Sequence, residues 1–357
     1  MLKSTLFIGL GGCGCKLIDT ALSLNPSLNT LFVNSNKNEV SNLDNFNVGL
    51  DNYLICTGNG SGRDREKAKK DISNNRNLII DYMSKQVNKY TNFVIIFSMN
   101  GGYGSGGFYT ITKVIYSLAK RYGNEIGITL LPVLPKLSHK RVDIENTLLA
   151  YNDIVELKKD GFICNYSFID NNKINNIKEF NKEVMQTILN AYSLNNIELD
   201  INDSRRIHNA RGYKVFLELN EEFCDNVEDA IDYSIHNSNF IIPESFKNCT
   251  HLGISVSENF NAFNISDEFN IKEFDKADIS DENNILVIGG CKEPISTIKA
   301  YEECLSKSMD YSIADEEEYI INIPKQEPKF EKFKGIVEEK PKKITKADLR
   351  KELDDLF

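Results

Sequence analysis

The sequence predicts an α/β protein in which a mainly parallel sheet is covered by helices and is followed by a smaller α+β unit and a flexible tail. Over the first 175 residues, short apolar stretches alternate with stretches of helical spacing, which is the pattern of βαβ units. Two of the apolar stretches run directly into glycine-rich turns. Beyond Asp315, prolines punctuate a Lys- and Glu-rich sequence with few apolar residues, which is typical of a flexible segment.

The composition of the 357 residues is that of a globular protein, with 41% hydrophobic residues and a formal net charge of −10. This charge disfavours general adhesion of the folded body to DNA, although a local basic segment can still bind it. No apolar run approaches the roughly 18 residues of a membrane span, and the apolar start lacks a small-residue cleavage site. We therefore expect a cytoplasmic protein without membrane contact. Eight cysteines without a C-x-x-C pair and four histidines without ligand spacing indicate reduced thiols and no metal site.

The predicted elements follow in chain order. In the first part they are strands at 4–8, 30–33, 53–56, 93–97, 126–133 and 162–169 and helices at 17–24, 64–89, 108–120 and 144–159. In the second part they are helices at 180–194, 227–238 and 293–309 and strands at 212–219, 251–256 and 285–288, with a polar, loop-rich stretch before the last strand. The helix at 180–194 is apolar around most of its girth, so we expect it to be buried.

The first glycine-rich turn is Gly9-Leu10-Gly11-Gly12-Cys13-Gly14-Cys15-Lys16, between a strand and a helix. Its glycines fit G-x-G-x-x-G, the dinucleotide fingerprint in which the backbone approaches a pyrophosphate. A dehydrogenase also needs an acid about 20 residues later to hold the ribose. The next strand ends in Asn34-Ser35-Asn36 instead, which argues against NAD.

The second turn, Asn100-Gly101-Gly102-Tyr103-Gly104-Ser105-Gly106-Gly107, follows the strand at 93–97 and leads into the helix at 108–120. Unpaired backbone N–H groups and the dipole of the following helix both favour an anion at such a turn. One turn alone is explained as well by a flexible loop without a ligand. Because a second turn of the same kind is present, the sequence indicates a nucleotide.

The two turns, about ninety residues apart, resemble those of the tubulin/FtsZ superfamily of polymerising GTPases. Residues 9–16 match the first family motif, G-x-G-G-x-G-x-N, except that Lys16 replaces Asn. Residues 100–106 match the phosphate signature G-G-G-T-G-[ST]-G at four of its five glycines and at the hydroxyl residue, while Asn100 and Tyr103 depart from it. This divergence in a short chain is most similar to the TubZ branch of plasmid and phage segregation proteins. The resemblance covers roughly residues 4–290 and is weak in the last third.

The resemblance implies a Rossmann-like GTPase domain that binds GTP or GDP, with Mg²⁺ held mainly through the phosphates. Asn171 matches the Asn of I-P-N-D-K-L, whose amide bonds guanine in the family, and a turn-forming Asn is the alternative. The nucleotide-binding residues that it implies are Gly11, Gly12, Cys13, Gly14, Lys16, Asn34, Asn100, Gly101, Gly102, Tyr103, Gly104, Ser105, Gly106 and Asn171.

A third flexible loop, residues 57–64, occupies the position at which the family senses the terminal phosphate. Arg63 in this loop either pairs with that phosphate or is simply solvated. Glu145, Asn146 and Glu183 are less definite candidates for ribose and base contacts, because the match through those helices is uncertain by a few residues.

Residues 198–207 resemble the family stretch N-V-D-F-A-D-V and keep its D-x-x-D spacing at Asp200 and Asp203. In the family this loop enters the nucleotide site of the next subunit, where its carboxylates polarise the attacking water, so hydrolysis requires assembly. An isolated D-x-x-D is more commonly a helix N-cap with an acidic first turn. The position after a buried helix and before the first strand of the second unit favours the catalytic role.

The predicted domains are a GTP-binding domain at 1–178, a central helix and catalytic-loop segment at 179–207, a C-terminal α+β domain at 208–312 and a flexible tail at 313–357. Between Lys325 and Lys351 basic residues outnumber acidic ones, and Thr345 and Asp348 form a capping pair for a short final helix. We expect the tail either to fold on a DNA-bound adaptor or to act only as a solubilising segment.

The implied function is that of a GTPase that assembles head to tail into dynamic cytoplasmic filaments, which segregate or position plasmid or phage DNA. Its expected partners are further copies of itself and the adaptor, without direct DNA binding by the folded body. One alternative is an FtsZ-like division or phage-centring GTPase. Alternatives of other classes are an NAD-dependent Rossmann oxidoreductase and a nucleotide-binding scaffold that does not hydrolyse its ligand.

Overall fold

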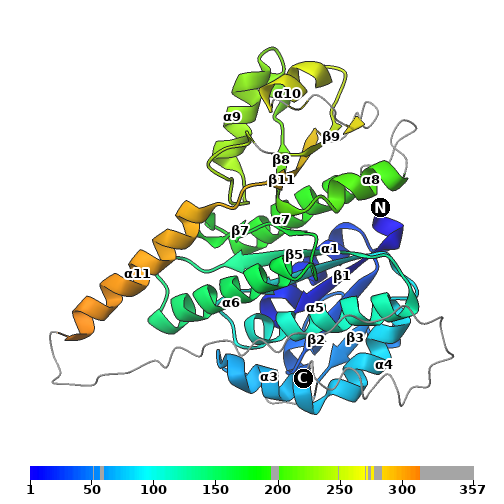
Figure 1. Cartoon of the computed structure of the whole chain (residues 1–357), viewed down its shortest axis with the longest axis vertical. Helices are drawn as coiled ribbons and strands as arrows, with labels where there is room; N and C mark the ends of the chain where they lie inside the picture. The colour runs from blue at the N-terminus through cyan, green and yellow to red at the C-terminus, as the bar shows by residue number, and fades with distance from the viewer. Residues whose placement is uncertain are drawn as a thin grey trace, which may run out of the picture.

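The computed structural model describes residues 1–50, 52–56, 60–193, 201–247, 249–269, 271, 275–276 and 284–313. One mixed sheet runs through these residues and helices cover both of its faces (Figure 1). The strands are β1 (Thr5–Leu10), β2 (Thr30–Asn34), β3 (Tyr53–Ile55), β4 (Asn92–Ser98), β5 (Gly127–Leu134), β6 (Asn165–Tyr166), β7 (Ile169–Asp170), β8 (Gly212–Glu218), β9 (His251–Ser255), β10 (Asp275–Lys276) and β11 (Ile285–Cys291). The α-helices are α1 (Gly11–Leu24), α2 (Lys37–Ser41), α3 (Arg65–Asn74), α4 (Arg76–Gln86), α5 (Tyr103–Tyr122), α6 (Arg141–Lys159), α7 (Ile177–Tyr192), α8 (Ile201–His208), α9 (Val227–Asn237), α10 (Ala262–Glu268) and α11 (Ile295–Ile313).

The order of the strands creates a binding crevice beside β1. The sheet runs β10-β9-β11-β8-β6-β5-β4-β1-β2-β3, and β7 also pairs with β5. Neighbouring strands from β3 to β8 are parallel, whereas β11 is antiparallel to both β8 and β9. The chain leaves β1 towards β2 on one side and returns to β4 on the other. In open α/β sheets, ligands bind at such a reversal, outside the carboxyl ends of the strands.

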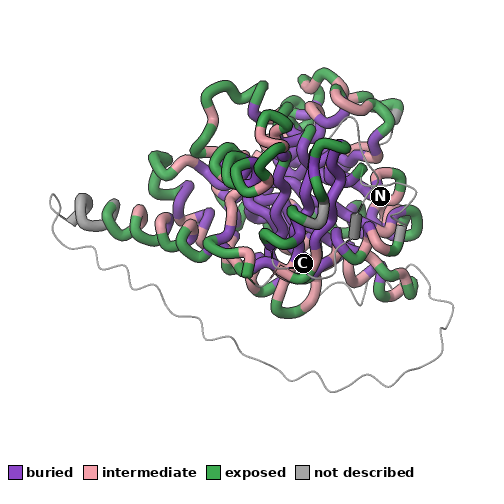
Figure 2. Tube along the Cα trace, turned by 90° about the horizontal axis from the view of Figure 1, so that it is seen from above, coloured by how far each residue is buried: buried purple, intermediate pink, exposed green. Residues whose placement is uncertain are grey.

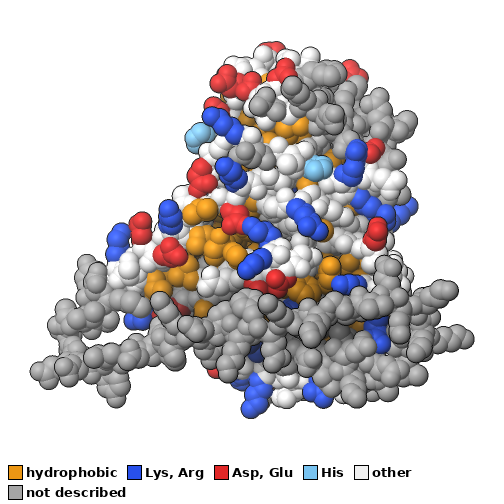
Figure 3. Space-filling model, in the orientation of Figure 1, with side chains coloured by type: hydrophobic (Ala, Val, Ile, Leu, Met, Phe, Trp, Pro, Cys, Tyr) orange, Lys and Arg blue, Asp and Glu red, His pale blue; other side chains and the backbone are white. Residues whose placement is uncertain are grey.

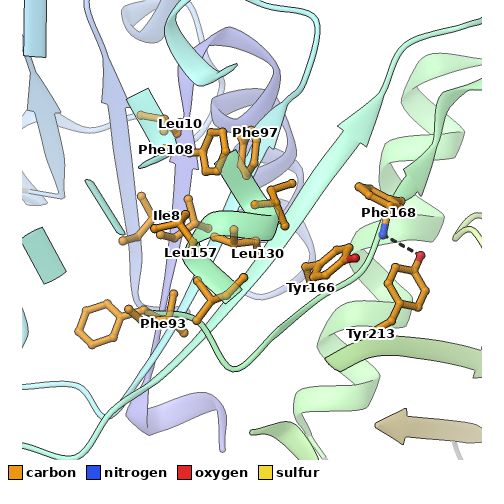
Figure 4. Packing of buried hydrophobic residues seen from close by; sticks show 14 of the residues in the cluster. Ile8, Leu10, Phe93, Phe97, Phe108, Leu130, Leu157, Tyr166, Phe168 and Tyr213 are labelled. Atoms are coloured by element: carbon orange, nitrogen blue, oxygen red, sulfur yellow. Dashed lines mark hydrogen bonds between the residues drawn. The ribbon is translucent and has the colours of Figure 1, made fainter. Parts of the chain in front are cut away.

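Side chains of β1 alternate between two apolar cores because successive residues of a strand point to opposite faces. Ile8 and Leu10 belong to the core under α3, α4, α5 and α6, whereas Phe7 belongs to the core under α1 and α7. In the first core, the ring of Phe97 on β4 stacks on Phe108 of α5 with their centroids 4.2 Å apart (Figure 4). Burying a side chain of this size stabilises a fold by about 1.5–3 kcal/mol. The buried residues fill the middle of the molecule along the sheet (Figure 2).

The parallel part of the sheet continues into its antiparallel part through β6 and β8, where Tyr166 lies opposite Tyr213. The Tyr213 hydroxyl accepts a hydrogen bond from the Phe168 N–H at 3.0 Å (Figure 4) and donates one to the Ile241 carbonyl at 2.8 Å. This contact ties β8 to the chain that follows β6. The sheet therefore crosses the proposed boundary near residue 208, and the domain limits remain proposals.

The α/β class with a mixed sheet is confirmed, but several predicted elements are divided differently. The predicted helix at 64–89 is two helices, α3 and α4, which meet at Asn75. The Asn75 side chain donates to the Asp71 carbonyl at 2.7 Å and so competes with the helical backbone bonds. The predicted strand at 162–169 is reduced to β6 and β7, and the polar stretch before β11 contains α10 and β10.

The prediction that the central helix, α7, carries apolar side chains around most of its circumference was wrong. Val184 and Ile188 of α7 are buried in the core shared with α1, whereas Lys182, Glu183 and Gln186 are exposed. The helix is therefore amphipathic, with one face against the sheet and α1 and the other in solvent. The predicted end of this helix at residue 194 lies outside the described residues.

On the face drawn in Figure 3, Lys and Arg side chains are interspersed with Asp and Glu side chains over the described surface. Among the described helices, none combines the length and apolar character that crossing a bilayer requires. The predicted tail lies outside the described residues from residue 314 onward.

Candidate nucleotide site

A cavity of about 570 Å³ lies outside the carboxyl ends of β1, β2 and β4, where the strand order reverses. Pockets for small organic ligands span about 300–1,000 Å³, so this cavity is large enough to hold much of a nucleotide. Its walls come from the starts of α1 and α5, the end of β2 and the loop before α3. The lining residues are Leu10, Gly11, Gly12, Cys13, Asn34, Ser35, Asn36, Glu39, Gly60, Ser61, Gly62, Arg63, Ser98, Gly101, Gly102, Tyr103 and Gly104.

Two helices direct their amino termini into this cavity. α1 begins at Gly11 and α5 at Tyr103, so most of each glycine-rich turn forms the first turn of a helix. The helix starts predicted at residues 17 and 108 were wrong. Glycine has low helix propensity, which argued against including the glycines, but here they lie in the helices because they allow close packing. Neither helix has a side-chain N-cap, whereas the neighbouring α2 and α3 are capped by Asn36 and Asp64. Uncapped first-turn N–H groups and two helix dipoles favour a multiply charged anion at this point.

The two helix starts pack directly on each other. Gly11 has a φ of +71°, which L side chains rarely adopt, and a Cβ there would lie 2.9 Å from the Gly104 nitrogen. A Cβ at Gly104 would lie 2.9 Å from the Leu10 carbonyl oxygen. Glycine at both positions therefore lets the two backbones meet, which brings the two sets of N–H groups to one place.

Other glycines of the two motifs support the site from behind. A Cβ at Gly14 would lie 2.1 Å from the Ile96 carbonyl oxygen, so this glycine seats α1 against β4. A Cβ at Gly106 would lie 2.6 Å from the Arg65 carbonyl oxygen, so Gly106 seats α5 against α3. The nearest atom to a Cβ at Gly101, in contrast, is the Ser98 carbonyl oxygen at 3.9 Å. Gly101 therefore faces open space in the cavity.

The structure brings most of the sequence-predicted binding residues to the cavity. Those that line it are Gly11, Gly12, Cys13, Asn34, Gly101, Gly102, Tyr103 and Gly104. Those outside its lining are Gly14, Lys16, Asn100, Ser105, Gly106 and Asn171. Lys16 is exposed on α1, and Asn171 begins a short 3-10 helix after β7, at the same carboxyl edge of the sheet.

The hydroxyl of Ser105 is turned away from the cavity. Ser105 is fully buried, and its Oγ accepts a hydrogen bond from the Arg65 guanidinium. Arg65 in turn pairs with Asp153 of α6 at 2.5 Å. Burial lowers the pKa of Arg65, and the carboxylate of Asp153 raises it again. The hydroxyl residue of the motif thus fixes the start of α5 to α3 and α6 in this structure.

Glu39 was missed in the sequence and lies in the cavity wall. Its Oε2 accepts a hydrogen bond from the Asn34 amide at 2.9 Å, and its Oε1 lies 2.1 Å from where a Cβ of Gly12 would be. Asn36, the N-cap of α2, accepts hydrogen bonds from the Asn38 and Glu39 N–H groups. Asn followed three residues later by Glu is a helix-start signal that could have placed Glu39 in the turn after β2.

Arg63 closes one side of the cavity but is bound to a carboxylate. Its backbone has a φ of +70°, and its Nη1 pairs with Oδ2 of the buried Asp143 at 2.9 Å. The Asn146 amide donates to the Arg63 carbonyl at 2.9 Å and to the Asn100 carbonyl at 3.2 Å. Asn146 therefore links the third loop to the second glycine motif. The proposed phosphate contact of Arg63 would require it to leave or share Asp143.

Cys13 is the thiol that lines the cavity. Burial raises its pKa to about 11, against the smaller lowering effect of Lys16. The thiol is therefore protonated at neutral pH and is not an activated nucleophile. Within the described residues, no group of three or more His, Cys, Asp or Glu side chains is arranged to hold a metal ion. A divalent ion here would depend on phosphate oxygens for most of its ligands.

Asp203, one member of the predicted catalytic pair, lies away from this cavity. Asp200 is outside the described residues, and Asp203 is in the first turn of α8, where its Oδ1 pairs with Arg206 at 2.8 Å. The next turn of α8 contacts the start of β4, because the Arg205 guanidinium donates to the Thr91 hydroxyl at 3.1 Å. The nucleotide cavity is at the opposite end of β4, about 20 Å away for a strand of this length. Asp203 therefore cannot reach the cavity of its own chain.

A second cavity, of about 670 Å³, lies at this amino-terminal edge of the sheet. Its lining includes the cations Lys120, Arg205, Arg206 and Arg211 and the carboxylate Glu125. The edge that carries α8 is thus locally cationic, opposite the edge that carries the anion-binding helix starts.

Comparison with known proteins identifies relatives of both the sequence and the fold. Residues 4–179 match the model described as the tubulin/FtsZ family, GTPase domain. The chain is 24% identical over 361 residues to the tubulin-like protein TubZ of a Clostridium botulinum C phage, which covers 99% of this chain and 98% of that protein.

Two solved structures share the fold. The tail-truncated TubZ of Clostridium botulinum phage c-st superposes with a TM-score of 0.77 at 20% identity, covering 87% of this chain and 99% of that one. A GTPγS-form protofilament of TubZ from Bacillus thuringiensis serovar israelensis gives a TM-score of 0.65 at 17% identity, covering 87% and 92%. At these identities the two structures establish the arrangement of the chain and not its ligands.

Proposed function

The chain carries a GTPase domain of the tubulin/FtsZ family over residues 4–179, and from this premise we propose that it assembles head to tail and hydrolyses GTP at the contact between successive subunits. The observation that carries the proposal is the separation of the two halves of the site. The anion-binding cavity is at the carboxyl edge of the sheet, and α8 with Asp203 is at the amino edge. One molecule therefore holds an incomplete site, and a second copy in line with it completes the site.

The residues of the cavity fit the phosphates of GTP. The first-turn N–H groups of α1 and α5 would hold the phosphate oxygens, with Gly11 and Gly104 keeping the two helix starts together. Asn171, at the same edge of the sheet, is proposed to bond the base through its amide. Mg²⁺ supplies further positive charge to the phosphates when bound, and Glu39 is the carboxylate in the cavity wall that can approach it.

Hydrolysis is proposed to depend on Asp200 and Asp203 of the following subunit. A carboxylate can orient a water molecule in line with the terminal phosphate and accept hydrogen-bond donation from it. Before assembly, Asp203 pairs with Arg206 of the same helix at 2.8 Å. Because the water-orienting groups arrive only with the neighbour, turnover follows assembly, and the loss of the terminal phosphate would then weaken the contact that made it possible.

The contact between the two edges is heterologous, since different surfaces of each copy meet, and such contacts continue into open filaments. The protofilament form of the Bacillus thuringiensis relative supports this arrangement. We extend the proposal to segregation or positioning of plasmid or phage DNA, because the glycine motifs and the full-length match both point to TubZ proteins. An FtsZ-like division or phage-centring role is the alternative within the family. The match to a GTPase domain argues against the alternative of an NAD-dependent oxidoreductase.

The catalytic role is tested by Asp203→Asn together with Asp200→Asn. We expect GTP turnover per polymerised subunit to fall by about a hundredfold or more, as for the loss of a group that positions a proton-transferring water. Filaments should still form and should persist longer. Unchanged turnover in filaments would contradict the role of both carboxylates and would favour a scaffold function.

The DNA role is tested through the tail. Deleting residues 325–357, which lie outside the described part, should abolish binding to a DNA-bound adaptor and leave GTP turnover unchanged. The measurement is co-sedimentation of filaments with DNA in an extract that contains the adaptor. Adaptor binding that survives the deletion would overturn the proposed function of the tail, and a lasting loss of turnover would assign the tail to assembly.

A further inference from the structure

Lys214 of β8 is a charged residue that the proposed mechanism does not use, although it is fully buried close to α8. Its Nζ donates hydrogen bonds to the His208 carbonyl at 2.5 Å and to the Thr129 hydroxyl at 3.3 Å. The aromatic rings of Tyr192 and Phe216 lie 5.7 and 5.8 Å from the same nitrogen. Among the described residues no carboxylate forms an ion pair with it.

The His208 carbonyl that Lys214 binds is at the carboxyl terminus of α8, where unsatisfied carbonyls and the helix dipole favour a cation. Asn165 of β6 donates to the same carbonyl at 2.8 Å and to the Ala210 carbonyl at 2.9 Å. The Thr129 hydroxyl donates to Asn165 Oδ1 at 2.8 Å, which closes the network. Side chains of β8 and β6 therefore hold the end of α8 at the His208 carbonyl, and Thr129 of β5 links these two side chains.

The same cluster also holds the end of α7. The His208 ring lies 4.2 Å from the Tyr192 ring, and its Nε2 is 3.1 Å from the Ala191 carbonyl. α7 ends at Tyr192 and α8 begins at Ile201, so the cluster fastens both helices that flank the segment with Asp200. Asp203, on the first turn of α8, is fixed through the helix to this anchor.

We propose that Lys214 is a positioning residue for GTP hydrolysis, which anchors α8 so that Asp203 is presented to the nucleotide of the next subunit. This inference rests on the proposed function, because it assigns a role only if α8 acts on a neighbour. A methionine would fill the same space without burying a charge, and replacing buried charges by apolar side chains is often stabilising. The geometry therefore favours a role in orientation over a role in overall stability.

The surroundings of Lys214 determine the pKa of its ammonium group. Burial lowers its pKa to about 7, and the thiol of Cys164 is the group that raises it. The other titratable groups of the cluster are His208 and Tyr192: burial and Lys214 lower the pKa of His208, and burial raises that of Tyr192. The amino terminus of Met1 also lowers the pKa of His208.

The test is Lys214→Met in the chain of 357 residues. The control is Lys158→Met, a substitution on α6, away from α8, that removes an ammonium group paired with Glu293. Three quantities are measured: GTPγS binding by dilute protein, filament mass with GTPγS, and GTP turnover per polymerised subunit. For Lys214→Met we expect turnover to fall by about tenfold or more, as for a misplaced catalytic group. GTPγS affinity, filament mass and the KM for GTP taken from the turnover measurements should match wild type, and Lys158→Met should match wild type in turnover as well as in these.

Normal turnover by Lys214→Met filaments would overturn the inference, and so would a loss of GTPγS binding, which would show a merely structural role. Should the variant fail to fold, Thr129→Val removes one bond of the same network, and its turnover should fall about two- to threefold. Unchanged turnover there would also overturn the inference. The proposed function fails separately: wild-type turnover that does not depend on protein concentration would refute it, whatever Lys214→Met does.

Discussion

Lys214 is fully buried, in an environment very unlike water. Its Nζ contacts two aromatic rings, the His208 carbonyl and the Thr129 hydroxyl, with no ion-pairing carboxylate among the described residues. Glu39 is the second unusual residue, because its carboxylate lies at the start of α1, where the phosphates of a nucleotide would add further negative charge. Both residues have charges whose role cannot be inferred from the residue type alone.

The pKa of Lys214 predicts how stability depends on pH. Its value of about 7 in the fold lies below the ordinary 10.5, so the unfolded chain binds this proton more tightly between those values. The free energy of unfolding should therefore rise as the pH increases from about 7 towards 10.5, and below pH 7 the full cost of the buried charge is present.

Urea unfolding of wild type and Lys214→Met at several pH values measures this effect. The variant should be more stable than wild type at pH 7, and the difference should shrink as the pH approaches 10.5. Groups that do not interact with Lys214 titrate alike in both proteins, so their contributions cancel in the comparison. A difference that stays constant with pH would show that Lys214 titrates at its ordinary pKa.

At the scale of elements, the starts of the helices α1 and α5 form the nucleotide cavity. The glycines of the two motifs differ in how closely other atoms pack against them. Gly14 is pressed on the backbone of β4, with a Cβ position 2.1 Å from the Ile96 oxygen, whereas Gly101 faces the cavity. Gly14→Ala should therefore lower the free energy of unfolding by about 3 kcal/mol, at the upper end of overpacking effects. Gly101→Ala should change it by no more than about 1 kcal/mol.

Denaturant unfolding of the two variants provides the comparison, with Gly101→Ala as the matched control for the loss of a glycine. GTPγS binding should also be weaker for Gly14→Ala, because α1 would shift on β4. Equal stability of the two variants would mean that α1 can move away from β4 without cost, and the packing account of the first glycine motif would be wrong.

The sequence predicted the order of strands and helices in the first part because each glycine motif follows an apolar stretch and precedes a helical one. It could not show that the motifs are themselves the first turns of α1 and α5, since the packing of Gly11 on Gly104 joins segments far apart in the chain. The family resemblance assigned Ser105 to the ligand; its hydroxyl is bound to Arg65 in the structure, and its contact with a ligand stays a prediction. The break at Asn75 depends on a side-chain bond that competes with helix formation at a position where helical spacing continues.

Within the candidate site, the motif residues at the two helix starts could be predicted, and Asn146 was named as a less definite candidate. Glu39 carries only a helix-start signal in the sequence, and Asp143 reaches Arg63 only through the tertiary packing of α6. Lys214 was not singled out either, because a lysine in a predicted strand is normally assumed to face solvent. Such residues become candidates only once their burial and partners are known.

At the scale of the whole molecule, the two functional edges lie at opposite ends of the same strands. The anion-binding helix starts are at one end of β4, and the anchored α8 with its neighbouring cations is at the other. Under the proposed mechanism, Asp203 of one copy completes the nucleotide site of the next copy in a row, and assembly and hydrolysis are then two consequences of one contact.

The most direct test of this claim is the GTP turnover per subunit measured over a range of protein concentrations with GTP in excess. The account predicts that this rate is low in dilute protein, rises steeply as filaments form and then becomes constant per polymerised subunit. A rate per subunit that is the same at all concentrations, including those at which light scattering detects no filaments, would contradict it.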